Sequence, residues 1–437
     1  MNTNSKVLLT LILILFSLQN ITAQSRYGNY DLELLTFVAS GQSSSTSLQE
    51  VSIAQNELAI RYYNGTGGAR KDYTSAFKWF LKSAESGNEY GMYNVANRYA
   101  SGEGTSASMT QAAYWMERAA AYYMHDAAAK VAYWYMYGTG GITVDYNKAA
   151  KYAKIAVFTS LEDGLSRYIY AICFAYGYGV KQNADKAIYW ANKAIELDIT
   201  DSYYLLGIMY RDGVGVPKKP YKAEDYFLEG VWADNTACMK ALGDLYYTGA
   251  EDFYSHTGVA LDYWGQAANK GHLGAMLELA EEYSWGDEKY VDYSKGIYWY
   301  EKLIENGQVT LDNVDALSIL YHESKMYDKA AKMYRKIYSL GDNYGYNDLA
   351  YMYANGELGA PDFNMALSLL NTIIKAEPTN YDFLDSKGEI LLMKGDVKGA
   401  RKVWNTINKK SPLFYSNYIK EHEETTVLDE YMKNNPK

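Results

Sequence analysis

Small residues and large rings alternate along the chain at a spacing of three, and this pair recurs with a long period. In the first series a small residue is followed three positions later by a ring or a large apolar residue, and most of these rings have Gly three positions further on. The pairs are Ala59/Tyr62, Ala96/Tyr99, Ala132/Tyr135, Ala171/Phe174, Gly207/Tyr210, Gly243/Tyr246, Ala280/Tyr283, Ser318/Tyr321, Ala350/Tyr353 and Gly388/Leu391. Residues three apart share one face of a helix, so each pair predicts a helix that approaches a neighbour over its small residue.

A second series of such pairs lies between the members of the first. Its pairs are Ala76/Trp79, Ala112/Trp115, Ala149/Tyr152, Ala187/Trp190, Ala223/Tyr226, Ala260/Tyr263, Gly296/Trp299, Ala330/Met333, Ala366/Leu369 and Ala400/Val403. From Ala76 to Ala400 there are 324 residues over nine intervals, a mean period of 36. Because one helix hairpin cannot bury its apolar face alone, the pattern predicts an all-α fold, a right-handed α/α superhelical solenoid of about ten hairpins.

The residues around these pairs indicate where the helices begin and end. Gly after a first helix can adopt the left-handed conformation that ends it, and Asp four positions before a second-helix small residue can cap that helix. The capping candidates are Asp72, Asp145, Asp292 and Asp362. The four tryptophans of the second series, Trp79, Trp115, Trp190 and Trp299, occupy the recurrent packing position and are expected in the core.

Segments of the predicted first helices and of the predicted second helices resemble a known family. The first helices read LGIMYRDGVG at residues 206–215 and LGDLYYTG at 242–249, and the second helices read AAYWMERAA at 112–120 and YWGQAANKG at 263–271. These segments resemble the Sel1-like repeat family, relatives of the tetratricopeptide repeats, from about Ser52 to Glu377. Ser324 replaces the loop Gly in the eighth repeat, and the tenth repeat looks more like a tetratricopeptide unit. The resemblance implies a scaffold for protein complexes and no reaction.

The domain organisation follows from the repeats and from the two ends. Residues 1–23 read as a secretory signal peptide, because the apolar run Val7–Leu18 is followed by polar and small residues up to Ala23. Residues 24–50 are expected to be a loose segment with a Ser-rich linker, 51–376 repeats 1–9, 377–412 repeat 10, and 413–437 a capping helix and tail. The chain is then exported, to the periplasm or outside the cell, with no membrane span after signal cleavage. A retained N-terminal anchor is the alternative.

Composition and the absence of known motifs argue against several classes of function. The chain has 42 Lys+Arg against 52 Asp+Glu, a formal charge of −10, which argues against nucleic acid or anionic lipid as the main partner. Five scattered His and two Cys offer little for a metal site, and no hydrolase or phosphate-binding motif is present. We expect a non-enzymatic protein without a cofactor or metal. Cys173 and Cys238 fall in different repeats and are expected to be separate buried thiols.

The groove along the concave side of the predicted superhelix is the best candidate site. The positions six and two before each first-helix ring point away from the partner helices, towards the expected concave side. The candidate partner-binding residues there are Tyr93, Asn97, Tyr133, Tyr168, Tyr204, Asp244 and Glu281. Exposed rings make good anchors for a protein or peptide partner.

Three alternatives to this hypothesis remain. The tyrosines could instead be packed between helices. A glycan could bind the same rings, as an envelope or extracellular ligand. A hydrolase using Glu278, Glu281 and Glu282 would need two carboxylates that flank a bond, and Glu281 and Glu282 diverge on a helix.

The expected signal peptide predicts the first residue of the mature chain. Cleavage after Ala23 leaves Gln24 at the N-terminus. N-terminal sequencing and intact mass of the chain from an exporting host should therefore show the loss of residues 1–23. A chain that is exported but still begins at Met1 would support the retained anchor instead.

Overall fold

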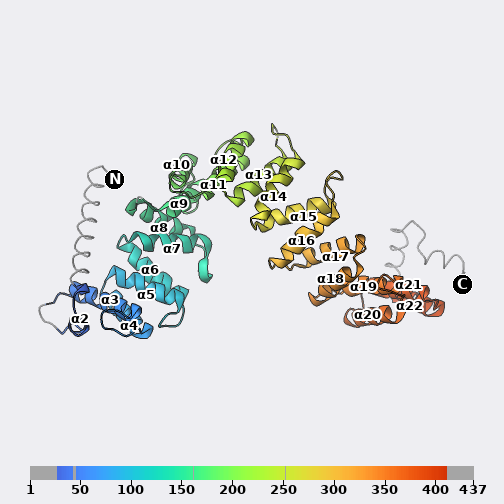
Figure 1. Ribbon diagram of the computed structural model, residues 1–437, viewed down its shortest axis with the longest axis horizontal. Helices are drawn as coiled ribbons and strands as arrows, with labels where there is room; N and C mark the ends of the chain where they lie inside the picture. The colour runs from blue at the N-terminus through green and yellow to red at the C-terminus, as the bar shows by residue number, and fades with distance from the viewer. Residues whose placement is uncertain (1–26, 43–45, 161, 251, 411–437) are drawn as a thin grey trace. The chain divides into compact units, whose positions relative to one another are not determined.

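The computed structural model describes residues 27–42, 46–160, 162–250 and 252–410, and every regular element in this part of the chain is a helix (Figure 1). The helices are α2 (Leu32–Ala39), α3 (Leu48–Asn64), α4 (Tyr73–Glu85), α5 (Glu89–Ser101), α6 (Met109–Ala121), α7 (His125–Tyr137), η1 (Thr139–Gly141), α8 (Tyr146–Thr159), α9 (Gly164–Tyr176), α10 (Ala184–Ile195), α11 (Asp201–Asp212), α12 (Pro220–Trp232), α13 (Thr236–Thr248), α14 (Thr257–Asn269), α15 (Leu273–Trp285), α16 (Tyr293–Glu305), α17 (Leu311–Glu323), α18 (Tyr327–Ser339), α19 (Tyr344–Asn355), α20 (Phe363–Ala376), α21 (Tyr381–Met393) and α22 (Val397–Lys410). From α3 onwards they form ten successive pairs, which confirms the predicted all-α fold of repeated hairpins.

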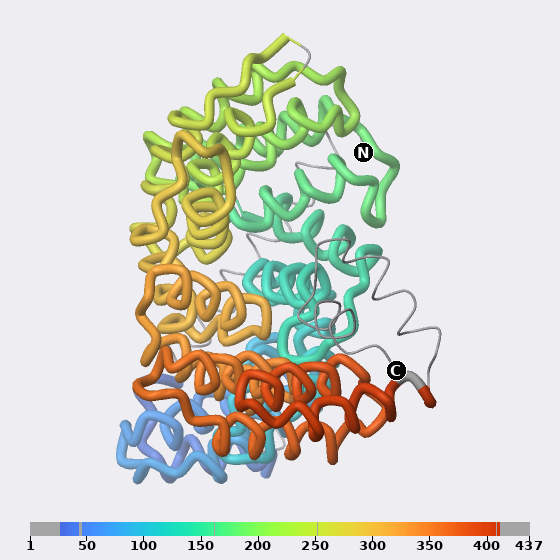
Figure 2. Tube along the Cα trace, turned by 90° about the vertical axis from the view of Figure 1, so that its right-hand side faces the viewer, coloured from blue at the N-terminus to red at the C-terminus, as the bar shows by residue number. Residues whose placement is uncertain are grey.

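The chain divides into two compact units. Unit 1 runs to Ser255 and unit 2 begins at His256, so the boundary separates α13 from α14, the two helices of the sixth pair. Within each unit, consecutive helices pack against one another, and the trace in Figure 2 shows the hairpins stacked in sequence order. In unit 1 the first helices also contact each other directly, α7 with α9 and α9 with α11.

Small residues create the close contacts between helices. A Cβ atom added at Gly207 would lie 2.2 Å from Cε1 of Phe227, and the Ala132 and Ala149 side chains are completely buried. Of the four tryptophans expected in the core, Trp115 and Trp299 are buried. The other two, Trp79 and Trp190, are half-buried.

The helix ends follow the predicted caps. The side chains of Asp72, Asp145, Asp292 and Asp362 accept hydrogen bonds from backbone N–H groups in the first turns of α4, α8, α16 and α20. Gly65 ends α3 in the left-handed region at φ 71°, as expected. Gly286 after α15 does not, since its φ is −79°, and the carboxylate of Glu282 accepts from the N–H of Asp287 there.

Part of the N-terminal segment is more ordered than the sequence predicts. Residues 24–50 are expected to be loose, but Leu32–Ala39 form α2, which packs on α3 and buries Leu35 completely. Arg61 of α3 donates to the carbonyl oxygens of Tyr27 and Tyr30 at 2.9 and 2.8 Å. A buried guanidinium thus holds the start of the described chain against the first repeat.

Other expectations for the two ends concern residues that the structure does not describe. The signal-peptide segment 1–23 and the segment 413–437 both lie outside the described residues. Within the described part, we find no helix with the length and apolar character needed to span a bilayer.

The two cysteines are separate buried thiols, as expected. Cys173 lies in α9 and Cys238 in α13, and neither forms a disulfide. Burial raises the pKa of each thiol to about 12, so both remain protonated and unreactive near neutral pH.

The packing of small residues predicts opposite effects for two Gly-to-Ala substitutions in unit 2. In Gly388→Ala the new Cβ would lie 2.5 Å from Nε1 of Trp404, a buried side chain held by a hydrogen bond to Asp385. We expect a loss of about 1–3 kcal/mol in the free energy of unfolding, since such overpacking forces the neighbours to move.

The matched control is Gly265→Ala, in the helix α14, where an added Cβ meets nothing within 4 Å. It should gain roughly 0.5–1 kcal/mol from the reduced entropy of the unfolded chain. Urea titration of both variants checks this, and an equal response of the two would contradict the packing argument.

Candidate functional site: a tyrosine surface on unit 1

The first helices of unit 1 bury one face and leave another open. On α7, Val131 and Ala132 are fully buried, whereas Tyr133, two positions before the ring of Tyr135, has 39% of its surface exposed. The same alternation holds on α9, where Ala171 is buried and Tyr168 is half-buried. Figure 1 shows α7, α9 and α11 along the inner side of the bend within unit 1, and α8, α10 and α12 on the outer side.

Five tyrosines gather on this open face, and we call them the inner tyrosine surface: Tyr133 and Tyr137 of α7, Tyr168 and Tyr176 of α9, and Tyr204 of α11. The rings of Tyr133 and Tyr137 have centroids 4.8 Å apart. Burial raises the pKa of the Tyr168 hydroxyl above its usual range, and Tyr137, Asp201 and Tyr204 add to the shift through their proximity. Burial also raises the pKa of Tyr137 to about 12. Tyr168 therefore lies at the centre of the cluster, and its hydroxyl stays protonated.

The hydroxyl groups of these five tyrosines have no hydrogen-bond partner among the described residues. Five of the eight tyrosines in the ring positions differ, because their hydroxyls are paired with charged side chains. Tyr135 donates to Glu117, Tyr246 to Glu224 and Tyr321 to Glu301, while Tyr210 accepts from Lys222 at 2.9 Å and Tyr353 from Arg335 at 3.0 Å. These five ring-position tyrosines have partners within the fold, and those of the inner surface do not.

The structure brings together some of the predicted site residues and separates others. Tyr133, Tyr168 and Tyr204 belong to the inner tyrosine surface. Tyr93 and Asn97 of α5 are instead joined to α7 by Lys130, whose Nζ donates to Asn97 at 2.9 Å and lies 4.9 Å from the Tyr93 ring centroid.

The two acidic residues of the predicted site differ in place. Asp244 accepts from Lys240 at 2.8 Å on α13. It lies near Arg211, whose pKa is raised by its hydrogen bond to Asp212 and further by Tyr204 and Asp244, whereas Glu281 belongs to unit 2. Tyr137 and Tyr176 are the members that the sequence analysis missed. Tyr137 follows Tyr133 by four positions, one turn along the same face, so helical periodicity extended past the ring would have found it.

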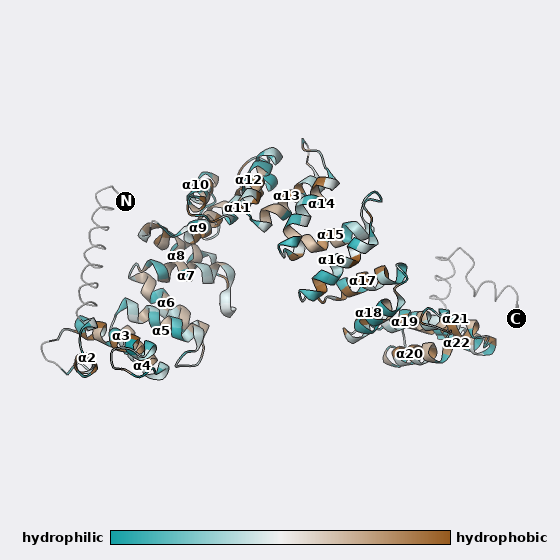
Figure 3. Cartoon of the chain, in the orientation of Figure 1, coloured by the Kyte–Doolittle hydropathy of each residue, from teal (hydrophilic) through white to brown (hydrophobic). Residues whose placement is uncertain are grey.

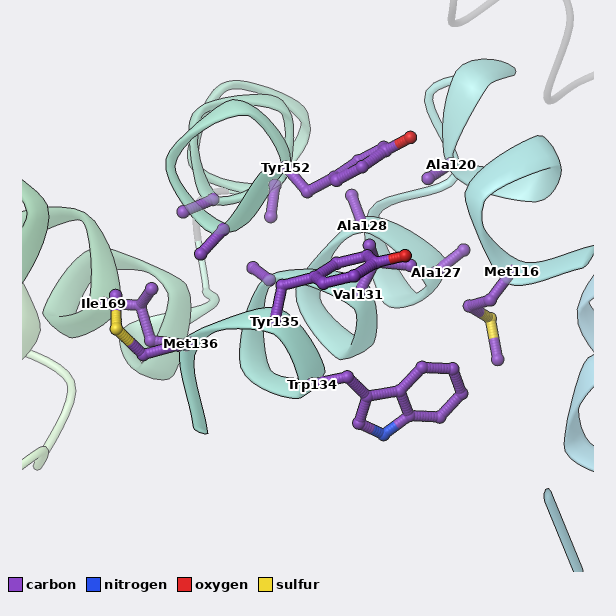
Figure 4. Packing of buried hydrophobic residues seen from close by; sticks show 14 of the residues in the cluster. Met116, Ala120, Ala127, Ala128, Val131, Trp134, Tyr135, Met136, Tyr152 and Ile169 are labelled. Atoms are coloured by element: carbon purple, nitrogen blue, oxygen red, sulfur yellow. The ribbon is translucent and has the colours of Figure 1, made fainter. Parts of the chain in front are cut away.

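A cleft on a different face belongs to the repeat framework. It has a volume of about 1000 Å³ and is lined by α6, the loop after α7, and the start of α8. At its floor, Glu117 accepts from Tyr135, from Lys148 at 2.8 Å and from Tyr152 at 3.2 Å. Figure 4 shows the Tyr135 and Tyr152 rings extending in the same direction from α7 and α8.

The same arrangement recurs in unit 2. There Glu301 of α16 accepts from Tyr321 of α17 and from Lys329 of α18, so the cluster links one repeat to the next.

Unit 2 presents acidic residues at the equivalent positions. In Figure 3, α7–α9 are mostly pale or brown, whereas α17 and α18 are largely teal. Burial raises the pKa of Glu281, with Glu278 adding to the shift, and burial raises the pKa of Asp348 to about 6, with Asp315 and Asp342 adding. The Glu278, Glu281 and Glu282 carboxylates do not converge, since Glu282 is buried against the end of α15 while Glu281 is exposed.

Comparisons with known proteins agree with this architecture. A stack of paired helices with a period near 36 residues is a tetratricopeptide-like α/α repeat protein. The model of the Sel1 repeat matches residues 52–88, 89–121, 125–157, 165–199, 200–230, 236–272, 274–308 and 343–372, so the chain belongs to the Sel1 repeat family. Proteins of this family are generally non-catalytic scaffolds for protein interactions. The unmatched stretches include the eighth and tenth repeats, which the sequence analysis found divergent.

Individual relatives are distant. Chitin synthase regulatory factor 2 from Schizosaccharomyces pombe is 25% identical over 181 residues, which cover 38% of this chain and 34% of the relative, so the chain spans about a third of that protein's length. A protective antigen of uropathogenic Escherichia coli with an SLR fold is 22% identical, covering 91% of this chain and 92% of the other, at a TM-score of 0.41. A Sel1 repeat protein from Oxalobacter formigenes is 24% identical, covering 50% and 86%, at a TM-score of 0.38.

The raised pKa of Asp348 predicts that replacing this residue stabilises the folded chain, by an amount that depends on pH. A carboxyl group whose folded pKa is about 6, against 3.8 for the free side chain, contributes stability below about pH 4 and loses it as the pH rises through 6. Asp348→Asn should therefore raise the free energy of unfolding at pH 8 by up to about 3 kcal/mol, at about 1.4 kcal/mol per pKa unit.

Urea titration of the wild type and Asp348→Asn at pH 4 and pH 8 checks this sign. The two proteins should converge at pH 4. An undiminished gain at pH 4 would mean that packing, and not titration, causes the effect.

Proposed function

We propose that the chain is an exported, non-enzymatic scaffold that binds a segment of a partner protein on the inner tyrosine surface. The observation that carries the proposal is the contrast between the two kinds of tyrosine. Five of the eight ring-position tyrosines have charged partners for their hydroxyls within the fold, while the five on the inner surface have none among the described residues. Rings with open hydroxyls can offer both apolar contact and hydrogen bonds to a partner.

The exposure of the rings supports a surface that binds rather than one that packs. Tyr133, Tyr137 and Tyr176 expose 39%, 47% and 40% of their surfaces. Tyr133 adjoins Tyr137 on α7, and Tyr137 and Tyr176 both lie close enough to Tyr168 to add to the effect of burial, which raises the pKa of its hydroxyl. Folding does not require large rings at these positions, because Val131 and Ala132 already fill the contacts with neighbouring helices. Clustered aromatic side chains are the groups that most often dominate binding energy at protein interfaces.

Two further considerations support the proposal, one for export and one for action by binding. The apolar run Val7–Leu18 with the small residues up to Ala23 supports export, to the periplasm or beyond the cell. The Schizosaccharomyces pombe relative is named as a regulatory factor of an enzyme, which suits a protein that acts by binding.

The proposal predicts that binding depends on the inner rings and not on equally exposed outer ones. A photo-reactive benzophenone side chain at position 133 identifies the partner, and its affinity is then measured with the purified proteins. The variant Tyr133→Ala with Tyr137→Ala should weaken binding by roughly 30-fold, the size of one interface hot spot. Its melting temperature should change little, because both rings are exposed.

The matched control is Tyr189→Ala on α10. The Tyr189 side chain is 53% exposed, and its ring centroid lies 5.1 Å from that of Trp190. This substitution should leave the affinity unchanged. Equal weakening by the inner and outer substitutions, or an equal loss of stability and binding in the inner variant, would contradict the assignment. Binding of chitin or cellulose oligosaccharides without any protein partner would favour the glycan alternative.

A further inference from the structure

We infer that the open face of α22, the last described helix, binds the chain's own acidic segment 413–430, which packs there as the first helix of a capping repeat. The inference concerns the end of unit 2 and does not depend on the inner tyrosine surface. It follows from the charge of α22, from the sequence that comes after it, and from the register of the repeats.

The side of α22 away from its buried residues is strongly basic. Its exposed cationic side chains are Lys398, Arg401, Lys402, Lys409 and Lys410, and the helix contains no Asp or Glu. The chain as a whole has a formal charge of −10, so this concentration of positive charge is unlike the rest of the protein. Lys398 and Lys402 are four positions apart, and like charges at that spacing destabilise a helix. An acidic group against this face would remove the repulsion.

The sequence directly after α22 supplies the opposite charge. Positions 421–430 contain five Asp or Glu and no Lys or Arg. Because this segment is joined to α22 by a short stretch of chain, its effective concentration at the basic face is about millimolar, which a separate acidic partner would have to match. Tethering and charge together therefore favour the chain's own segment as the occupant of this face.

The described repeats give the register in which the segment follows. Buried residues of α22 repeat those of α20 at an offset of 34 positions. The pairs are Ala366 and Ala400, Leu370 and Trp404, and Ile373 and Ile407. Pro378 comes two positions after the end of α20 and leads into α21, and Pro412 comes two positions after the end of α22. The sequence after α22 thus repeats the turn into α21, and the segment follows where a next first helix belongs.

The same offset identifies an ionic contact. Between α21 and α20, Nζ of Lys387 donates to Oδ1 of Asn371 at 2.6 Å. Glu421 stands 34 positions after Lys387. Arg401 and Lys409 stand one helical turn before and after the position of α22 that corresponds to Asn371. The register of the preceding repeat therefore brings the Glu421 carboxylate between two cations of α22.

Apolar residues of the preceding joint are also exchanged for charges on both sides. Leu367 of α20 packs against the buried cluster of α21 and α22, and Ile390 of α21 is completely buried. Arg401 stands 34 positions after Leu367, and Glu424 stands 34 positions after Ile390. A cation on α22 and an anion on the segment thus replace two apolar residues. This exchange suits the end of a stack, where the terminal unit needs a polar outer face.

The test is zero-length coupling of carboxylates to lysines by a carbodiimide, applied to the dilute full chain and read by mass spectrometry. We expect links from Lys409 to Glu421 and Glu424 within one molecule. They should decrease in about 1 M NaCl, where the Debye length is only about 3 Å. Glu423 is the matched control, because it lies two positions from Glu421 and so on another side of a helix. Its links to Lys409 should be few.

Chymotrypsin cleavage after Tyr418 gives a second readout. Glu421→Gln with Glu424→Gln should raise the cleavage rate roughly fivefold, because cleavage follows the population of the undocked segment and exposed ion pairs contribute modestly. Glu423→Gln should leave the rate unchanged. The exchange Glu421→Lys with Lys409→Glu should restore the protection that Glu421→Lys alone removes.

Equal linking of Glu423 and Glu421 to Lys409, or a cleavage rate unaffected by the loss of both carboxylates, would overturn the inference. Links found only between two molecules would assign the basic face to a second copy of the chain, and would overturn it as well. Partner binding on the inner tyrosine surface should be the same in all these variants, so the proposed function is judged separately.

Discussion

The close approach of two helices over an Ala or Gly side chain is the constraint on which the whole structure depends. At Gly207 the ring of Phe227 occupies the space where a side chain would begin, and Ala132 and Ala149 are completely covered by their neighbours. A hairpin whose helices meet this closely still leaves one apolar face uncovered, and only the next hairpin can cover it. The pairing of a small with a large residue therefore recurs in every repeat. Because this pair fixes which face of each helix is packed, it also decides which of the other residues face outwards.

That direction divides the tyrosines into two groups with different tasks. A ring beside the small residue is drawn into the contact between helices, and its hydroxyl then needs a partner inside the protein, as Tyr135 finds in Glu117 and Tyr321 in Glu301. Tyr133, two positions before the ring of Tyr135, faces outwards, where water can satisfy its hydroxyl. Displacing that water is favourable for a ligand that offers the hydroxyl a hydrogen bond in its place.

The features that the sequence predicts well are those decided by residues close together in the chain. Helix pairs, the caps at Asp72 and Asp145, and the left-handed turn at Gly65 all depend on neighbours within about one helical turn. Contacts between distant residues were not predictable in the same way. α2 is ordered because Arg61 reaches back to the carbonyls of residues near position 30, and Tyr93 is engaged by Lys130 from the next repeat.

The positions that the framework leaves unconstrained are also those where the two units differ most. On α7, α9 and α11 of unit 1 they carry uncharged side chains, the tyrosine rings among them, while unit 2 carries carboxyl groups there, including Glu281 and Asp315. Like charges that raise one another's pKa lower the stability of the folded chain at neutral pH, so folding alone does not explain them. Because the packing residues are the same kind in both units, the surface chemistry of a repeat can change without altering its fold, and the binding properties of each unit must be sought in these outward positions.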